Sequence, residues 1–96
     1  MEAIILHGLK FSTVLIEDVK SYLNVCNDDD NFLIQTFLDS SRAYIRNYTG
    51  QTDSYLNEQR DIVVALYMLV EQYYDGNNNH EKSIENILNL HSNNLI

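Results

Sequence analysis

Residues 27–50 read NDDDNFLIQTFLDSSRAYIRNYTG and carry the clearest helical pattern in the chain. The stretch begins with negative charge and with short side chains that accept hydrogen bonds, and both favour the start of a helix. These cap candidates are Asn27, Asp28, Asp29 and Asp30. Gly50 adopts the left-handed conformation at little cost and is suited to end the helix. We therefore predict one long central helix, with the other segments packed on it.

The apolar positions of this stretch recur every three or four residues, which predicts one buried helical face. They are Leu33, Ile34, Phe37, Leu38, Ser41, Tyr44, Ile45 and Tyr48. The run of aspartates also suggests a calcium-binding loop. When that loop is counted from Asp28, Leu33 stands where glycine is required and Asp39 where glutamate is required. We therefore predict helix capping and no metal ion.

Composition favours a single all-α domain over residues 1–96. Proline is absent and glycine occurs three times, which disfavours a turn-rich sandwich or barrel, and 45% hydrophobic residues suffice for a modest core. A net charge of -8 opposes nonspecific binding to a phosphate backbone. A single cysteine forms no intrachain disulfide, and no stretch resembles a signal peptide or a membrane span. We expect synthesis in the cytoplasm and no membrane association.

The remaining pattern predicts a compact bundle of four or five helices. Residues 1–12 have no clear period and form an arm of uncertain structure. A short helix follows over residues 15–23, capped by Ser12 or Thr13. Residues 51–57 are a polar connection in which Thr52, Asp53 or Ser54 caps the next helix. Two further helices cover residues 58–74 and the segment after Ser83, which carries Ile84, Ile87 and Leu88, and residues 92–96 fray.

The middle of the helix at residues 58–74 is apolar on every side. Its sequence from Ile62 to Val70 is IVVALYMLV, which also suits a buried strand, but the flanking glutamates and glutamines favour a helix. A chain this small has little surface with which to cover such a helix, so we expect part of it to contact another subunit. The interface candidates, with apolar residues of the two chain ends, are Val64, Tyr67, Met68, Tyr73, Tyr74, Ile4, Ile5, Leu6, Leu95 and Ile96.

Residues typical of catalysis or metal binding do not form a recognisable motif. His7, His80 and His91 lie on three separate segments without metal-ligand spacing. Cys26 has no matching histidine and carboxylate, and we expect it to be a small buried side chain. Glycine-rich phosphate loops and paired catalytic carboxylates are also absent. We therefore predict that the chain is not an enzyme and needs no cofactor.

Five motifs in this order resemble the small all-α head-tail connector, or adaptor, proteins of tailed bacteriophages. The motifs are IEDVKSYLNV, NDDDNFL, SSRAYIRNYTG, VVALYMLVEQYYDG and SIENILN. Together they cover about residues 15–90, and their order and spacing are more specific than any one motif. The sequence departs from the pattern in its N-terminal arm and in DGNNNHEK, where relatives more often carry a basic or proline-containing turn.

The resemblance implies a structural protein of the virion, located at the head-tail junction and made in the cytoplasm of a bacterial host. Its partners would be copies of itself in a closed ring that matches the portal's symmetry, the portal protein, and tail-completion or further connector proteins. DNA would pass through the ring without specific binding. Two alternatives remain open. They are an acidic DNA mimic and a small regulatory dimer built around Tyr67 and Met68.

Overall fold

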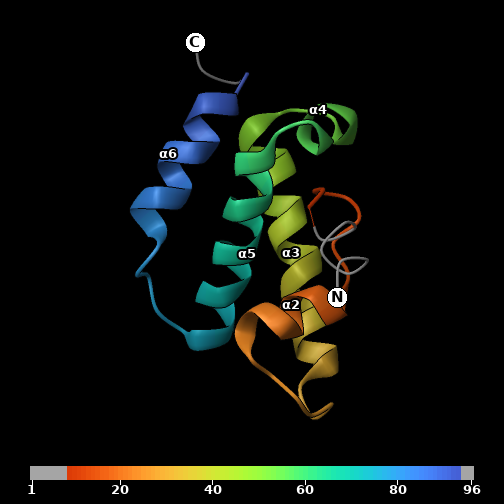
Figure 1. The fold of residues 1–96 in the computed structure, drawn as a ribbon. Helices are drawn as coiled ribbons and strands as arrows, with labels where there is room; N and C mark the ends of the chain where they lie inside the picture. Colours follow the sequence, from red (N-terminus) through yellow and green to blue (C-terminus); the bar gives the residue numbers. More distant parts are fainter. Residues whose placement is uncertain (1–8, 94–96) are drawn as a thin grey trace.

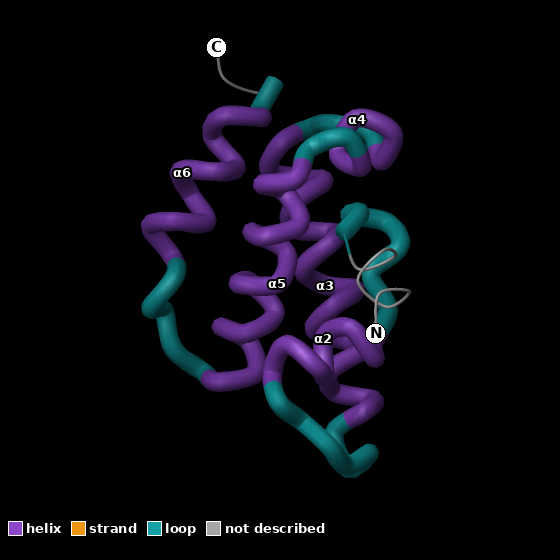
Figure 2. Tube along the Cα trace, in the orientation of Figure 1, coloured by secondary structure: helices purple, strands orange, loops and turns teal. Residues whose placement is uncertain are grey.

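The computed structural model describes residues 9–93, which fold into five helices (Figure 1). These are α2 (Ile16–Leu23), α3 (Asn31–Thr49), α4 (Asp53–Asn57), α5 (Arg60–Asp75) and α6 (Glu81–His91). Figure 2 shows only helices and loops among these residues, so the all-α prediction is confirmed and the helix at Ile62–Val70 is preferred over the strand. The connection at residues 51–57 contains α4, which makes the fifth helix.

The long helix α3 ends where the sequence predicts. Gly50 adopts a left-handed conformation with φ of 68°, and its backbone N–H donates to the Arg46 carbonyl oxygen at 2.8 Å. α5 ends in the same way at Gly76, with φ of 72°. Because L side chains are strained at these angles, the two glycines fix where both long helices stop. α3 and α5 pack against each other along the centre of the bundle.

The side-chain cap predicted for α3 is not formed. Asp30 precedes the helix, but its carboxylate makes no hydrogen bond to the free N–H groups of the first turn. It accepts instead from the Tyr74 hydroxyl at 2.9 Å. Asp28 accepts from Lys20 at 2.7 Å, and Asn27 accepts from the backbone N–H of Asp29 at 3.0 Å. Contacts with α2 and α5 therefore satisfy Asp28 and Asp30, two of the acceptors that the sequence assigned to the helix end.

None of the other predicted caps forms at the helix for which it was predicted. Leu15 precedes α2, and its backbone N–H donates to the Asp18 carboxylate at 2.8 Å, whereas Ser12 and Thr13 lie farther upstream. Ser83 lies inside α6, which begins at Glu81. The predicted cap of the helix at residues 58–74 is also absent, because α5 follows Gln59 without a side-chain cap. The Thr52 hydroxyl instead accepts from the backbone N–H of Tyr55 at 3.2 Å and caps α4, which lies inside the predicted polar connection.

α5 is covered by its own chain more completely than the sequence suggests. It contacts each of the other four helices, and most of its apolar middle lies in the core. Its buried residues are Ile62, Val63, Ala65, Leu66, Leu69 and Val70. From α3, the buried stripe is Ile34, Leu38, Ser41, Ile45 and Thr49. Only a narrow part of α5 is therefore left for another subunit. The expectation that the chain is too small to cover most of this helix is wrong.

Two residues of the segment that leads into α2 lie in the core, one of them within the predicted arm. Phe11 is 0% exposed and Val14 is also buried. The Arg42 guanidinium on α3 donates to the carbonyl oxygens of both residues, and burial lowers its pKa. At the other end of the chain, Asn93 donates its backbone N–H to the Thr49 carbonyl oxygen at 2.9 Å, which joins residue 93 to the end of α3. The rest of both predicted tails lies outside the described residues.

Candidate assembly surfaces

The five interface candidates on α5 do not form one surface. Val64 is 50% exposed, and Met68 is partly buried one turn later. Tyr67 packs on Tyr22 of α2 with ring centroids 5.1 Å apart. Tyr73 stacks on Phe37 of α3 with centroids 5.4 Å apart. The Tyr74 hydroxyl donates a hydrogen bond to the Asp30 carboxylate in the turn before α3. The candidates Ile4, Ile5, Leu6, Leu95 and Ile96 lie outside the described residues.

On one side of α5, the exposed Val64 and the partly buried Met68 and Glu71 form a narrow strip. Spacings of four and three residues place these side chains on one helical face. Glu71 accepts a hydrogen bond from the Tyr22 hydroxyl at 2.6 Å and lies 3.2 Å from Nε2 of His80. The Tyr22 hydrogen bond holds the pKa of Glu71 below its ordinary value, while burial and this carboxylate raise the pKa of Tyr22 to about 12. An apolar strip with a fixed polar border is typical of a protein contact.

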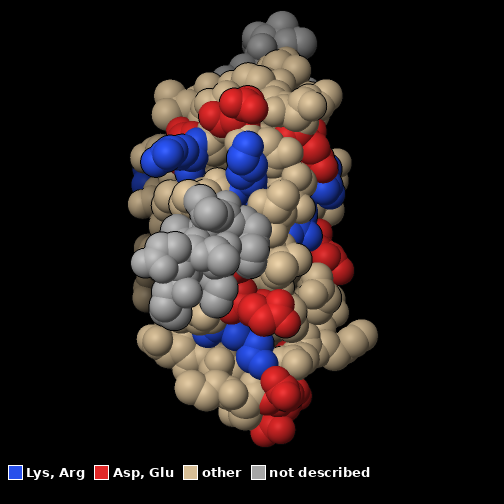
Figure 3. Space-filling view, turned by 45° about the vertical axis from the view of Figure 1, so that its right-hand side comes forward, with Lys and Arg blue, Asp and Glu red and all other residues tan. Residues whose placement is uncertain are grey.

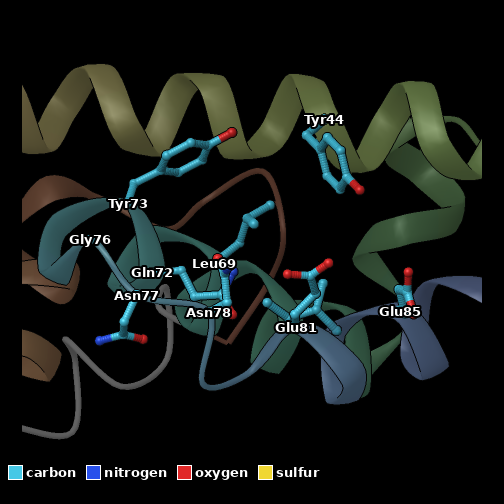
Figure 4. A pocket seen from close by; sticks show the side chains of 10 residues that line it. Tyr44, Leu69, Gln72, Tyr73, Gly76, Asn77, Asn78, Glu81 and Glu85 are labelled. Atoms are coloured by element: carbon cyan, nitrogen blue, oxygen red, sulfur yellow. The ribbon is translucent and has the colours of Figure 1, made fainter.

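A second surface feature, absent from the sequence prediction, is a groove of about 410 Å³ between α3, the C-terminal end of α5 and α6. Tyr44 from α3 and Tyr73 from α5 line one wall, and Glu81 and Glu85 from α6 line the other (Figure 4). Leu69 and Ile84 supply the apolar part of the lining, and residues 76–78 close one end. We call this feature the α3/α6 groove.

The two glutamates of the α3/α6 groove are uncompensated. Neither has an ion-pair partner within residues 9–93, although other carboxylates of this part of the chain are paired. In Figure 4 the carboxylate of Glu81 points from α6 toward the α3 wall. Burial raises the pKa of Tyr44, and the negative charges of Glu85 and Glu81 add to this effect. The groove therefore combines aromatic faces with negative charge, an environment that attracts a cation.

The opposite side of α3 is lined by residues 9–14 and two arginines. The Arg46 guanidinium lies over the Phe11 ring and donates to the Asp53 carboxylate at 2.7 Å. Leu9 and Lys10 precede the buried Phe11 and are exposed. On the face drawn in Figure 3, basic and acidic side chains lie in separate, interspersed groups. Among the described residues visible in Figure 3, the acidic side chains do not form a continuous band.

Polar side chains also fix the C-terminal end of α6. His91 lies 2.9 Å from the Asp61 carboxylate through Nε2 and 2.9 Å from the Tyr55 hydroxyl through Nδ1. This triad joins α4, α5 and α6.

Within residues 9–93, no group of three or more His, Cys, Asp or Glu side chains is arranged to hold a metal ion. Cys26 is exposed, so its predicted burial is wrong.

The groove was missed because three segments distant in sequence form it. The sequence predicts Tyr44 on the buried face of the long helix and assigns no role to Glu81 or Glu85. No local sequence pattern distinguishes a glutamate beside a tyrosine wall from one in open solvent.

Among the described helices, none has both the length and the apolar character that crossing a membrane requires.

Comparison with known proteins gives one match. A model of the phage gp6-like head-tail connector protein family matches residues 13–95, which span all of α2 to α6. No curated protein and no solved structure matches the chain.

Proposed function

Because the chain belongs to the phage gp6-like head-tail connector family, we propose that it assembles as a ring beneath the portal and joins the DNA-filled capsid to the tail. The observation that carries this proposal is the extent of the match, since residues 13–95 include every described helix. Head-tail connection is a structural role and not an enzymatic one. The resemblance found in the separate motifs and the match over the whole domain point to the same family.

Two features of the fold support assembly with other proteins of the head-tail junction. The strip of Val64, Met68 and Glu71 has an apolar centre and a polar border fixed by hydrogen bonds. The α3/α6 groove combines apolar and aromatic lining with two glutamates that form no ion pair within residues 9–93. Such borders are typical of interfaces, where a dry centre is surrounded by a wet rim. We propose that the strip contacts another subunit or the portal, and that the ring follows the portal's symmetry. Tail-completion or further connector proteins would bind the face turned away from the portal.

The charge of the chain suits a ring through which DNA passes. With a net charge of -8, repeated subunits repel the phosphate backbone and do not hold it. A DNA mimic would instead need unpaired carboxylates in a row along one exposed face. Here Asp28 pairs with Lys20, Asp53 pairs with Arg46, and the Asp61 carboxylate contacts the His91 ring. The pairing and the interspersed charges in Figure 3 make the mimic the weaker interpretation.

The direct test is to mix the purified chain with the portal of the same phage and to image the product by electron microscopy. We expect a closed ring stacked on one end of the portal. The matched variant Met68→Asp should keep the helical circular-dichroism spectrum while reducing the fraction of portals that carry a ring, because it places a charge in the apolar strip. Portals that remain bare at saturating concentrations of the chain would contradict the proposal.

A further inference from the structure

We propose that the α3/α6 groove of one subunit receives Leu9 and Lys10 of a second copy of the chain. This inference rests on the proposed ring and names the contact that would form it. The Lys10 ammonium group would lie between the tyrosine wall and the two glutamates of α6. The Leu9 side chain would cover the apolar lining at Leu69 and Ile84.

The lining of the groove is suited to a cationic side chain with an apolar neighbour. Tyr44 and Tyr73 offer aromatic rings, and a cation placed over such a face is attracted by the ring's electron density. Glu81 and Glu85 supply the opposite charge, and charge-assisted hydrogen bonds are the stronger ones. A volume of about 410 Å³ is in the range of pockets that enclose several ligand groups.

The occupant follows from how the basic side chains of the chain are used. Lys20 pairs with Asp28, Arg46 pairs with Asp53, and Arg42 is held by backbone carbonyl oxygens. Lys82 is part of α6, the helix that carries the glutamates. Within residues 9–93, Lys10, Arg60 and Lys82 have no ion-pair partner, and of these Lys10 and Arg60 lie outside α6.

Of these two cations, Lys10 has the apolar neighbour that the groove requires. Leu9 is 40% exposed, whereas Arg60 stands between Gln59 and Asp61, whose carboxylate already binds His91. Phe11 is fully buried one residue later, and Arg42 holds its carbonyl oxygen at 3.2 Å. Lys10 is therefore attached to a fixed point of the core, which reduces the entropy lost when it binds.

The two halves of this contact lie on opposite sides of one molecule. Figure 1 shows the segment that leads into α2 on one side of the α3 and α5 pair and α6 on the other. A contact between different surfaces of identical chains is heterologous, and it repeats from copy to copy until the rotation closes a ring. Each subunit would thus insert Leu9 and Lys10 into one neighbour and offer its own α3/α6 groove to the other neighbour.

A charge exchange tests this pairing. The variants Lys10→Glu and Glu81→Lys/Glu85→Lys should each weaken ring formation about tenfold or more, because like charges then meet in the groove. Their combination in one chain should restore assembly, because the charges are exchanged and not removed. Glu17→Lys is the control, since it changes the charge of an exposed glutamate on α2 and should leave assembly unchanged. Ring mass is measured by sedimentation and mass photometry with the portal present, and folding by circular dichroism.

Each of the other possible outcomes would refute one specific claim. Normal rings from both charge-reversed variants would show that the groove is not a contact between copies. Weakened variants whose combination does not recover would refute the pairing of Lys10 with these glutamates. Normal rings that no longer bind the portal would assign the groove to the portal. Absence of rings from the unaltered chain, with and without the portal, would instead refute the proposed function.

Discussion

The guanidinium group of Arg46 lies 5.3 Å from the centroid of the Phe11 ring, so a residue of α3 covers a side chain from the segment before α2. Phe11 is 0% exposed, and we expect Phe11→Ala to lower the free energy of unfolding by about 3–5 kcal/mol. Leu9→Ala is the matched control, because Leu9 is exposed and should change stability by less than about 0.5 kcal/mol. Urea denaturation measures both. Equal stability of the two variants would show that Phe11 is not a core residue.

The buried stripe of α3 gives a second prediction. Leu38 is 1% exposed, and Leu38→Ala should cost about 2–5 kcal/mol through lost burial and a cavity. Leu33 lies on the same helix but is 44% exposed, so Leu33→Ala should cost much less. Thermal melting of both variants compares them. A loss of under about half a kcal/mol for Leu38→Ala would mean that the stripe is assigned wrongly.

Two buried hydroxyl groups on α3 should respond in opposite ways. The Ser41 hydroxyl has no hydrogen-bond partner among the described residues, so Ser41→Ala should leave stability unchanged or raise it by up to about 1 kcal/mol. The Thr49 hydroxyl donates to the Ile45 carbonyl oxygen at 2.8 Å and accepts from the Gln51 N–H at 3.2 Å. Thr49→Val removes both bonds and should destabilise by about 1–3 kcal/mol. Destabilisation by Ser41→Ala of the same size would indicate a partner for its hydroxyl.

Acid should weaken the ion pair that links the end of α3 to α4. The hydrogen bond from Arg46 holds the pKa of Asp53 below its ordinary value of 3.8. A carboxyl group with a lowered pKa stabilises the fold above its ordinary pKa, and this contribution is lost as the pH falls through the folded-state pKa. Because both side chains are 42% exposed, the contribution is about 0.2–1 kcal/mol. The stability difference between the wild type and Asp53→Asn should therefore be present at pH 6 and vanish in strong acid. A difference that persists at pH 2 would refute the assignment.

The sequence predicted the parts of the fold that local chemistry decides. Gly50 ends α3 because the left-handed conformation favours glycine. Leu38 and Ile45 are buried because their spacing matches a helical turn. These features depend on residues within a few positions of each other, so the printed sequence contains their causes.

Long-range contacts decide the features that the sequence did not reveal. Phe11 is buried because Arg42 and Arg46, about thirty residues later, hold its backbone and cover its ring. Asp30 does not cap α3 because the Tyr74 hydroxyl reaches it from the far end of α5. The α3/α6 groove exists because the turn at residues 76–80 sets α6 beside α3. The spacing of apolar residues along the sequence does not show which distant side chains come into contact.

Joining of heads and tails in vitro tests the proposed connector role most directly. DNA-filled heads and free tails are prepared from a phage that lacks this chain, and the purified chain is added before infectious particles are counted. We predict that particles form in proportion to the added chain, that Glu17→Lys supports the same yield, and that the destabilised Phe11→Ala does not. Heads and tails that join equally well without the chain would contradict its role as the head-tail connector.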